Sequence, residues 1–184
     1  MNINAGKRLV SLDENEDQKY MGYYLNGQRD GDGLLIDFKK DYFYDGAWKS
    51  NKMHGFGKLK LGIKQKDTMY TIYHEGYFKN NFYDGPGIQM DIDGNIFNGT
   101  FLNNKKTGCG SYQRSDGTIE RGHWREDIRQ GLFKITYSND AEFCVNYVNG
   151  KEDGIPRDGD CTKVECLWSE WNFLEYSWCD TLVE

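Results

Sequence analysis

The sequence predicts an all-β protein, built as an elongated single-layer array of about six β-hairpins with a C-terminal amphipathic helix. Three observations support this fold class. A pattern of an aromatic residue, a glycine and a second aromatic residue, followed by Gly-x-Gly, recurs along most of the chain. The composition is typical of strands and tight turns, with 22 glycines, 13 tyrosines and 10 phenylalanines but only 2 prolines in 184 residues. After residue 157 the spacing of the apolar residues becomes that of a helix.

The repeating unit is clearest at residues 97–119, where Phe97-Asn98-Gly99-Thr100-Phe101 precedes Gly108-Cys109-Gly110. Its central glycine recurs at positions 22, 46, 76, 99 and 122, and Val145 takes this position in a degraded sixth copy. The steps between these positions are 24, 30, 23, 23 and 23 residues. A period of this length indicates a repeat architecture, in which each unit is stable only when stacked on its neighbours.

This pattern, Y-x-G-x-[FYW]-x-[ND]-[GN]-x-x-x-G-x-G, resembles the MORN (membrane occupation and recognition nexus) repeat over roughly residues 20–156. The resemblance implies a hairpin array with a structural or interaction role. In some family members the array precedes a lysine methyltransferase or phosphoinositide kinase domain, but residues 157–184 are too few for either. The sequence also lacks GxSxG, HExxH and GxxxxGK[ST] motifs, so we expect no enzyme.

The chain is expected to have three parts: an N-terminal arm over residues 1–19, the repeat array over 20–156, and the C-terminal segment over 157–184. The arm is either a solvated terminus or, over Lys7–Leu12, a short strand at the edge of the array. We see no signal peptide in the arm and no stretch long and apolar enough for a membrane span. A cytoplasmic protein is therefore expected.

Each repeat should be one β-hairpin. The first strand alternates with a period of two, and Asn-Gly or Asn-Asn follows it at 26–27, 80–81, 103–104 and 149–150. These residues tolerate the left-handed conformation of tight turns. The central glycine is expected to let a neighbouring ring lie flat against bare backbone, because glycine otherwise weakens a strand.

The third repeat departs from the pattern. Gln89 stands where its neighbours have Leu or Tyr, and Ile88, Met90 and Ile92 alternate one residue out of step. A slip of one residue would turn these side chains to the opposite face of the sheet. The extra residues at 62–67 are expected to extend a hairpin loop or to form a bulge.

The second aromatic residue of each unit forms a column on one face of the array. This column is expected to be the core of a thin sheet, which does not exclude a partner that covers part of the same face, or an aromatic groove that holds a helix or peptide of a partner protein. The column consists of Tyr24, Trp48, Phe78, Phe101, Trp124 and Tyr147.

Residues 39–66 carry eight lysines against Asp41 and Asp45, although the whole chain has a net charge of −6. Such a patch is a candidate site for anionic lipid, because each basic residue near an anionic membrane contributes about 1 kcal/mol. Alternatively, these lysines keep the edge of a hairpin soluble. Nucleic acid is not expected as a partner, since the chain has no basic domain. The candidate lipid-binding residues are Lys39, Lys40, Lys58, Lys60, Lys64 and Lys66.

The C-terminal segment is expected to form a helix. Thr162 and Glu165 have the spacing of a capping box, and apolar residues then recur at three- and four-residue steps as far as Leu182. The helix is expected to cap the last hairpin or to dock on another protein. Its apolar stripe contains Trp168, Trp171 and Trp178.

The cysteines at 109, 144, 161, 166 and 179 show no compact disulfide spacing. Free buried thiols in a reducing compartment are therefore expected. Zinc ligation by the last three is a weaker alternative, because the chain has no CxxC pair and only three histidines. No metal and no cofactor are expected.

Two functions fit these observations. The first is a scaffold that binds other proteins through the aromatic column within a large complex. Its setting would be the cytoskeleton or a ciliary axoneme, because arrays similar to this one include radial-spoke head proteins and scaffolds of parasite cytoskeletons. The second is an adaptor that binds anionic phospholipid at a membrane surface, as proposed for the junctophilins.

Overall fold

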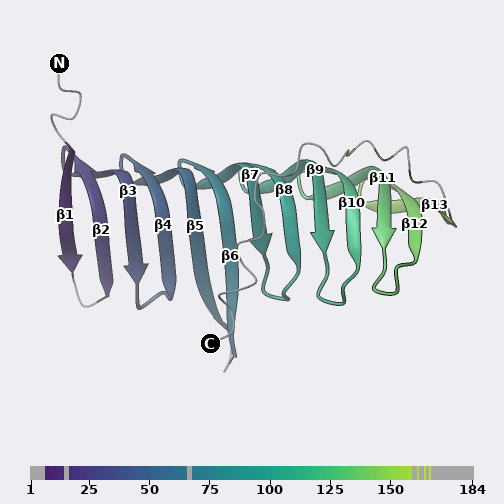
Figure 1. The fold of residues 1–184 in the computed structure, drawn as a ribbon, viewed down its shortest axis with the longest axis horizontal. Helices are drawn as coiled ribbons and strands as arrows, with labels where there is room; N and C mark the ends of the chain where they lie inside the picture. The colour runs from purple at the N-terminus through teal and green to yellow at the C-terminus, as the bar shows by residue number, and fades with distance from the viewer. Residues whose placement is uncertain are drawn as a thin grey trace, which may run out of the picture.

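The computed structural model describes residues 7–14, 17–65 and 68–158, together with Cys161, Val164 and Cys166. These residues form one open antiparallel sheet of 13 strands, whose order in space is the order in the sequence (Figure 1). The expected all-β single-layer array is therefore confirmed, and the described residues contain no helix. The strands are β1 (Lys7–Glu14), β2 (Gln18–Leu25), β3 (Gln28–Asp37), β4 (Tyr42–Lys49), β5 (Lys52–Gln65), β6 (Thr68–Lys79), β7 (Phe82–Met90), β8 (Ile96–Leu102), β9 (Lys105–Gln113), β10 (Ile119–Arg125), β11 (Ile128–Thr136), β12 (Glu142–Val148) and β13 (Lys151–Asp158).

The first strand belongs to the N-terminal arm. Residues 7–14 pair with β2 in antiparallel register, with Lys7 opposite Leu25 and Glu14 opposite Lys19. Of the two alternatives for the arm, the strand at the edge of the array is thus confirmed for these residues. The twelve strands after it form the six expected hairpins, from β2–β3 to β12–β13.

Each hairpin ends in a two-residue tip, and from the second hairpin on the tip is bonded to the hairpin before it. Both tip residues have positive φ, as at Asn103 (50°) and Asn104 (68°), which is the conformation of a type I′ turn. The Asn104 backbone N–H donates to the Tyr83 carbonyl at 3.0 Å, and the Asn104 Oδ1 accepts from the Tyr83 N–H at 2.7 Å. Asn51, Asn81 and Asp127 make the same pair of bonds. The tips therefore link successive repeats.

The first glycine of each Gly-x-Gly causes a bulge. Gly85, for example, has a φ of 118°, and the pairing of β6 with β7 shifts register at this level. A residue with positive φ opposite a shifted register is the geometry of a glycine bulge, which bends its strand. The same bulge occurs at the same height in every repeat, at Gly31, Gly55, Gly85, Gly108, Gly131 and Gly154.

The central glycines form a row across the sheet. Gly46, Gly76 and Gly99 lie opposite the second glycine of a Gly-x-Gly on both sides, and Gly22 and Gly122 do so on one side, so that glycine faces glycine from β2 to β10. A Cβ on Gly99 would lie 2.4 Å from Cζ of Phe97, whose ring lies against this backbone. The expected contact of rings with bare backbone is confirmed. The row consists of Gly22, Gly33, Gly46, Gly57, Gly76, Gly87, Gly99, Gly110 and Gly122.

An unbroken chain of aromatic rings lies on the side of the sheet that carries the ring of Phe97. We call this side the ring face and the opposite side the back face. Successive rings meet edge to face, with centroids 5.0–5.7 Å apart, a geometry that aromatic pairs prefer. The chain runs through Tyr24, Tyr20, Trp48, Tyr44, Phe78, His74, Phe101, Phe97, Trp124, Phe133 and Tyr147.

The third repeat keeps the register of the others, so the suspected one-residue slip does not occur. Gln89 lies opposite His74, as Leu59 lies opposite Tyr44 in the second repeat. A polar pair has therefore replaced an apolar pair at unchanged positions. The extra residues before this repeat lengthen β5 and β6, which extend beyond the neighbouring strands in Figure 1.

Two disulfides attach the residues after β13 to the sheet, which overturns the expectation of free thiols. Cys144 on β12 is bonded to Cys161, and Cys109 on β9 to Cys166, with Cα–Cα distances of 5.7 and 5.4 Å. Both distances are typical of disulfides. Val164 and Cys166 do not belong to a helix, and the remainder of the helix predicted for 163–182 lies outside the described residues.

Candidate functional site

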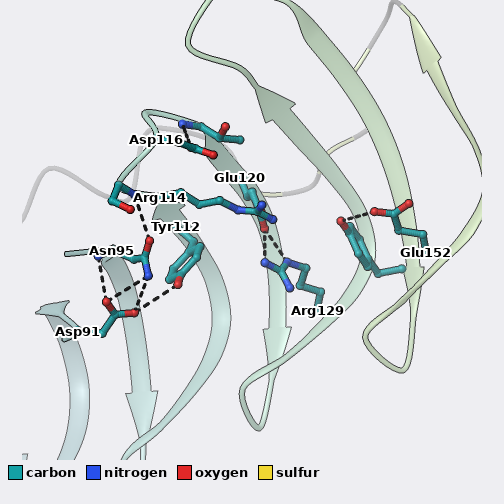
Figure 2. A network of polar contacts seen from close by, with 11 residues as sticks. Asp91, Asn95, Tyr112, Arg114, Asp116, Glu120, Arg129 and Glu152 are labelled. Atoms are coloured by element: carbon teal, nitrogen blue, oxygen red, sulfur yellow. Dashed lines mark hydrogen bonds and ion pairs between the residues drawn. The ribbon is translucent and has the colours of Figure 1, made fainter. Parts of the chain in front are cut away.

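A network of polar side chains occupies the ring face of the last three repeats (Figure 2). Its centre is Glu120 on β10, which is completely buried. Arg129 on β11 donates from Nε to the Glu120 Oε2 at 2.6 Å, and its guanidinium forms an ion pair with the same carboxylate. Arg114 pairs with the other carboxylate oxygen. Two guanidinium groups thus compensate one buried carboxylate, which is the condition for burying such a charge.

Glu120 occupies a position where other repeats have an aromatic ring. Tyr44 and Phe97 stand at the equivalent place, and their rings lie over the glycine row. In the fifth repeat Phe133 fills that space from the neighbouring strand, because a Cβ on Gly122 would lie 2.5 Å from its ring. Phe133, which replaces the second glycine of Gly-x-Gly, therefore supplies the ring that is missing at position 120.

The network extends on both sides of Glu120. On one side, Asp91 accepts hydrogen bonds from Asn95 at 2.9–3.1 Å and from the Tyr112 hydroxyl at 3.4 Å. On the other side, the Tyr147 hydroxyl donates to Glu152 at 3.4 Å. The polar groups thus reach from the turn after β7 to β13, while the ring face of the first two repeats is mainly apolar.

Three cations lie over the ring chain at equivalent positions, the second residue after a hairpin tip. Lys106 Nζ lies 4.6–5.4 Å from the centroids of Tyr112, Phe97 and Trp124. Burial lowers the pKa of Lys106, and the nearby Asp127 opposes this effect. Arg29 and Arg129 lie over their rings at 4.6–5.5 Å. Cations over ring faces are stabilised by the ring quadrupole and also attract anionic groups.

The aromatic column predicted to bind partners is placed in the core. Trp48, Phe78, Phe101, Trp124 and Tyr147 are each at most 5 % exposed, and Tyr24 is partly buried. Side chains this deeply buried leave almost no surface for a partner. These rings therefore form part of the core of the thin sheet.

The four candidate lipid-binding lysines with described side chains lie at two separate places. Lys39 and Lys40 lie in the turn after β3 and pair with Asp17 and Asp37. Lys58 and the exposed Lys60 lie on the back face of β5. Lys58 pairs with Glu75 at 3.2 Å.

Several predicted site residues have no described side chain. Lys64 belongs to β5, and only its backbone pairing with Met69 is described. Lys66 and the three tryptophans of the C-terminal segment, Trp168, Trp171 and Trp178, lie outside the described residues.

The polar network was not predicted, although one signal for it exists. When the repeats are compared with one another, an aromatic residue is replaced at 120 and a glycine at 133, in the same repeat. Two such departures together indicate that the ring over the central glycine comes from the neighbouring strand. The basic residues at 114 and 129 carry no signal of their own, because only the fold brings them to Glu120.

Within the described part of the chain, no group of three or more His, Cys, Asp or Glu side chains could hold a metal ion. The same residues include no helix that could cross a membrane.

Comparison with known proteins identifies the repeat. The family model of the MORN repeat matches residues 20–37, 44–62, 74–96 and 97–119, which are the first four hairpins. Alsin of Homo sapiens and of Mus musculus is 30% identical to this chain in an alignment of 143 positions that covers 72% of the chain, and alsin of Rattus norvegicus is 29% identical. The chain spans only 8% of the length of these relatives.

Proposed function

Because the chain is a MORN-repeat protein, we propose that it acts as a structural scaffold that binds partner proteins along its ring face. The MORN repeat is a non-catalytic unit, and its members serve as scaffolds or in membrane association. The proposed setting, a cytoskeletal or ciliary assembly such as a radial spoke, follows from the resemblance of the array to proteins of those structures.

The observation that supports this function is the row of cations over a rigid aromatic floor. Arg29, Lys106 and Arg129 lie at equivalent positions of three repeats and are only partly buried. Consecutive strands fix the spacing of these positions, because the tips of the second to sixth hairpins are bonded to the hairpin before them. A partner segment with acidic side chains would complement such a surface.

Affinity capture from a native cytoskeletal extract tests the proposal, with Lys106→Gln and Arg29→Gln as variants. Lys105→Gln is the matched control, since Lys105 lies on the back face and pairs with Glu126 at 3.3 Å. We expect the wild-type protein and the control to retain the same cytoskeletal proteins, and the two ring-face variants to lose them. Equal retention by all four proteins would contradict a binding role for the ring face.

Binding of anionic phospholipid is the second candidate function, and the exposed Lys60 beside Lys58 is the observation that favours it. Flotation with vesicles containing an anionic lipid at two salt concentrations separates the two functions. An adaptor would float at low salt and be released at high salt, because exposed charges are screened. The scaffold function predicts that the protein remains unbound at both.

A further inference from the structure

We propose that residues 167–184 bind to the back face of the same chain, over an apolar row centred on Phe56 and Tyr77. The row consists of Phe56, Tyr77, Pro86 and Thr100, and the strand pairing places them side by side. Phe56 lies opposite Tyr77, and Pro86 lies opposite Thr100, each next to a member of the glycine row. Side chains that alternate with the ring face in this way point to the back face.

The two disulfides bring the chain to the end of this row. Cys144 and Cys109 alternate with Val145 and Gly110 of the ring face and therefore lie on the back face. Cys161 is held on β12 and Cys166 on β9, so the chain runs back across the sheet after β13. Cys109 precedes Gly110, which lies opposite Gly99, so Cys109 lies at the end of the row beyond Thr100. The last described residue, Cys166, is therefore held beside the apolar row.

The row offers exposed aromatic surface that no other described residue covers. Phe56 is 39% and Tyr77 48% exposed, and their rings meet edge to face with centroids 5.7 Å apart. Two exposed rings in contact form a continuous apolar surface, which a further segment of the chain can cover.

The length and composition of the C-terminal residues fit this surface. From β9 to β5 is four strand spacings, or about 19 Å, whereas 18 residues span about 27 Å even as a helix. The segment contains three tryptophans, whose burial is favourable in proportion to the area removed from water. These tryptophans are Trp168, Trp171 and Trp178.

The charges are complementary as well. Residues 167–184 contain four carboxylate side chains and no Lys or Arg. The back face of β4, β5 and β6 has more lysines than carboxylates, since Asp45 and Glu75 are the only described acidic residues there. Its lysines are Lys49, Lys52, Lys58, Lys60 and Lys79. The bound segment would cover Lys58 and Lys60, and a ligand of the back face would have to displace it.

Quenching of tryptophan fluorescence by acrylamide in the oxidised full-length chain tests the proposal. The two tryptophans of the sheet, Trp48 and Trp124, are buried in every variant and contribute little quenching. We expect the C-terminal tryptophans to be protected in the wild type. Quenching should rise severalfold in the double variant Phe56→Ser/Tyr77→Ser. Phe38→Ser is the control, because Phe38 is exposed in a turn away from the row and should leave quenching unchanged.

A charge variant keeps the test independent of any folding defect. Lys60→Glu/Lys79→Glu changes two exposed residues of the back face and should also raise quenching, with an effect that salt reduces. Full quenching of the wild type, or equal protection in all variants, would overturn the proposal. So would protection that is lost on dilution together with a dimer in sedimentation, because the segment would then bind a second copy.

Discussion

The ring of Phe97 lies against the backbone of Gly99 and Gly110, and a Cβ on either residue would approach it to 2.4 Å. The atoms that would have to move belong to a buried ring in a continuous chain of rings. Such a ring cannot rotate out of the way without disturbing both neighbours, because packed interiors transmit strain. The glycine row is therefore a requirement of the core and not a feature of turns.

Gly99→Val should destabilise the protein by about 1–3 kcal/mol, the usual cost of overpacking. Thr100→Val is the matched control, since Thr100 is the next residue of the same strand but faces the back of the sheet. We expect the control to change stability by less than about 0.5 kcal/mol. Urea unfolding of both variants measures the difference, and equal midpoints would show that no ring depends on this glycine.

His74 is the one histidine described in the ring chain, and it is completely buried. It stacks on Tyr83 at 3.8 Å, and neither of its ring nitrogens has a hydrogen-bond partner. Burial lowers the pKa of His74 from 6.5 to about 3, because a charged imidazole would have no solvation there. The histidine thus serves as a neutral ring.

The stability of the protein should consequently fall in mild acid. Between pH 6.5 and about 3 the unfolded chain binds a proton at His74 that the folded protein does not, so each pH unit below 6.5 costs about 1.4 kcal/mol. His74→Phe should remove this loss, so the stability gain over the wild type should be larger at pH 5 than at pH 7.5. Denaturant unfolding at the two pH values measures it. His123→Phe changes an exposed histidine and should show no such pH-dependent gain in stability. If His74→Phe stabilised the protein equally at both pH values, the argument would be wrong.

At the scale of one hairpin, the fifth repeat shows how the array tolerates a changed unit. Glu120 stands in place of its first aromatic residue, and Phe133 stands in place of the second glycine of its Gly-x-Gly. Either change alone would leave a hole or a clash over Gly122, but together they keep one ring in that space. The carboxylate is then free to bind Arg114 and Arg129 and to join neighbouring turns and strands.

Restoring the pattern of the other repeats tests this exchange. Phe133→Gly should cost about 3–5 kcal/mol by emptying the space, and Glu120→Tyr about 1–3 kcal/mol by overfilling it. The double variant should cost less than the sum by about 0.5–3 kcal/mol, since each change relieves the other. Arg125→Tyr changes an exposed residue on the back face of the same strand. Its effect on the free energy of unfolding should be additive with that of Phe133→Gly. Additivity for Glu120→Tyr as well would mean that the two rings do not compete for one space.

For the whole molecule, the disulfides are the contacts that depart from nearest-neighbour stacking. Contacts in the sheet join successive strands, whereas Cys109–Cys166 joins residues 57 apart in sequence and bypasses β10 to β13. In a repeat array each unit contacts only its neighbours, so the last hairpins can open on their own. The bond between Cys109 and Cys166 closes the last two hairpins into one loop and opposes that opening.

Reduction should therefore lower the melting temperature and increase the opening of β11 to β13. A disulfide typically contributes about 2–4 kcal/mol. Thermal unfolding with and without reductant measures the shift, and hydrogen exchange locates it. A variant with serine at 109, 144, 161 and 166 should melt as the reduced protein and no longer respond to reductant. Identical melting of the oxidised and reduced wild type would show that these bonds do not hold the array.

The sequence alone determines the repeat, the all-β class, the hairpins and the positions of the tips that contain Asn-Gly or Asn-Asn. These features are local, because the period-two alternation and the left-handed tolerance of Asn and Gly act within a few residues. The glycine row was also predictable, since its spacing equals the repeat. Even the departure at Gln89 left the register unchanged, because Gly76 and Gly87 on either side of the hairpin kept their pairing.

Only the tertiary structure decided which side chains meet across repeats. Burial of the aromatic column, the ion pairs of Glu120 and the pairing of Cys109 with Cys166 depend on how far each repeat is displaced along the sheet from the next. No local pattern encodes that displacement. It results from bulges and tip bonds acting together over many strands, so residues far apart in sequence become neighbours only when the array is complete.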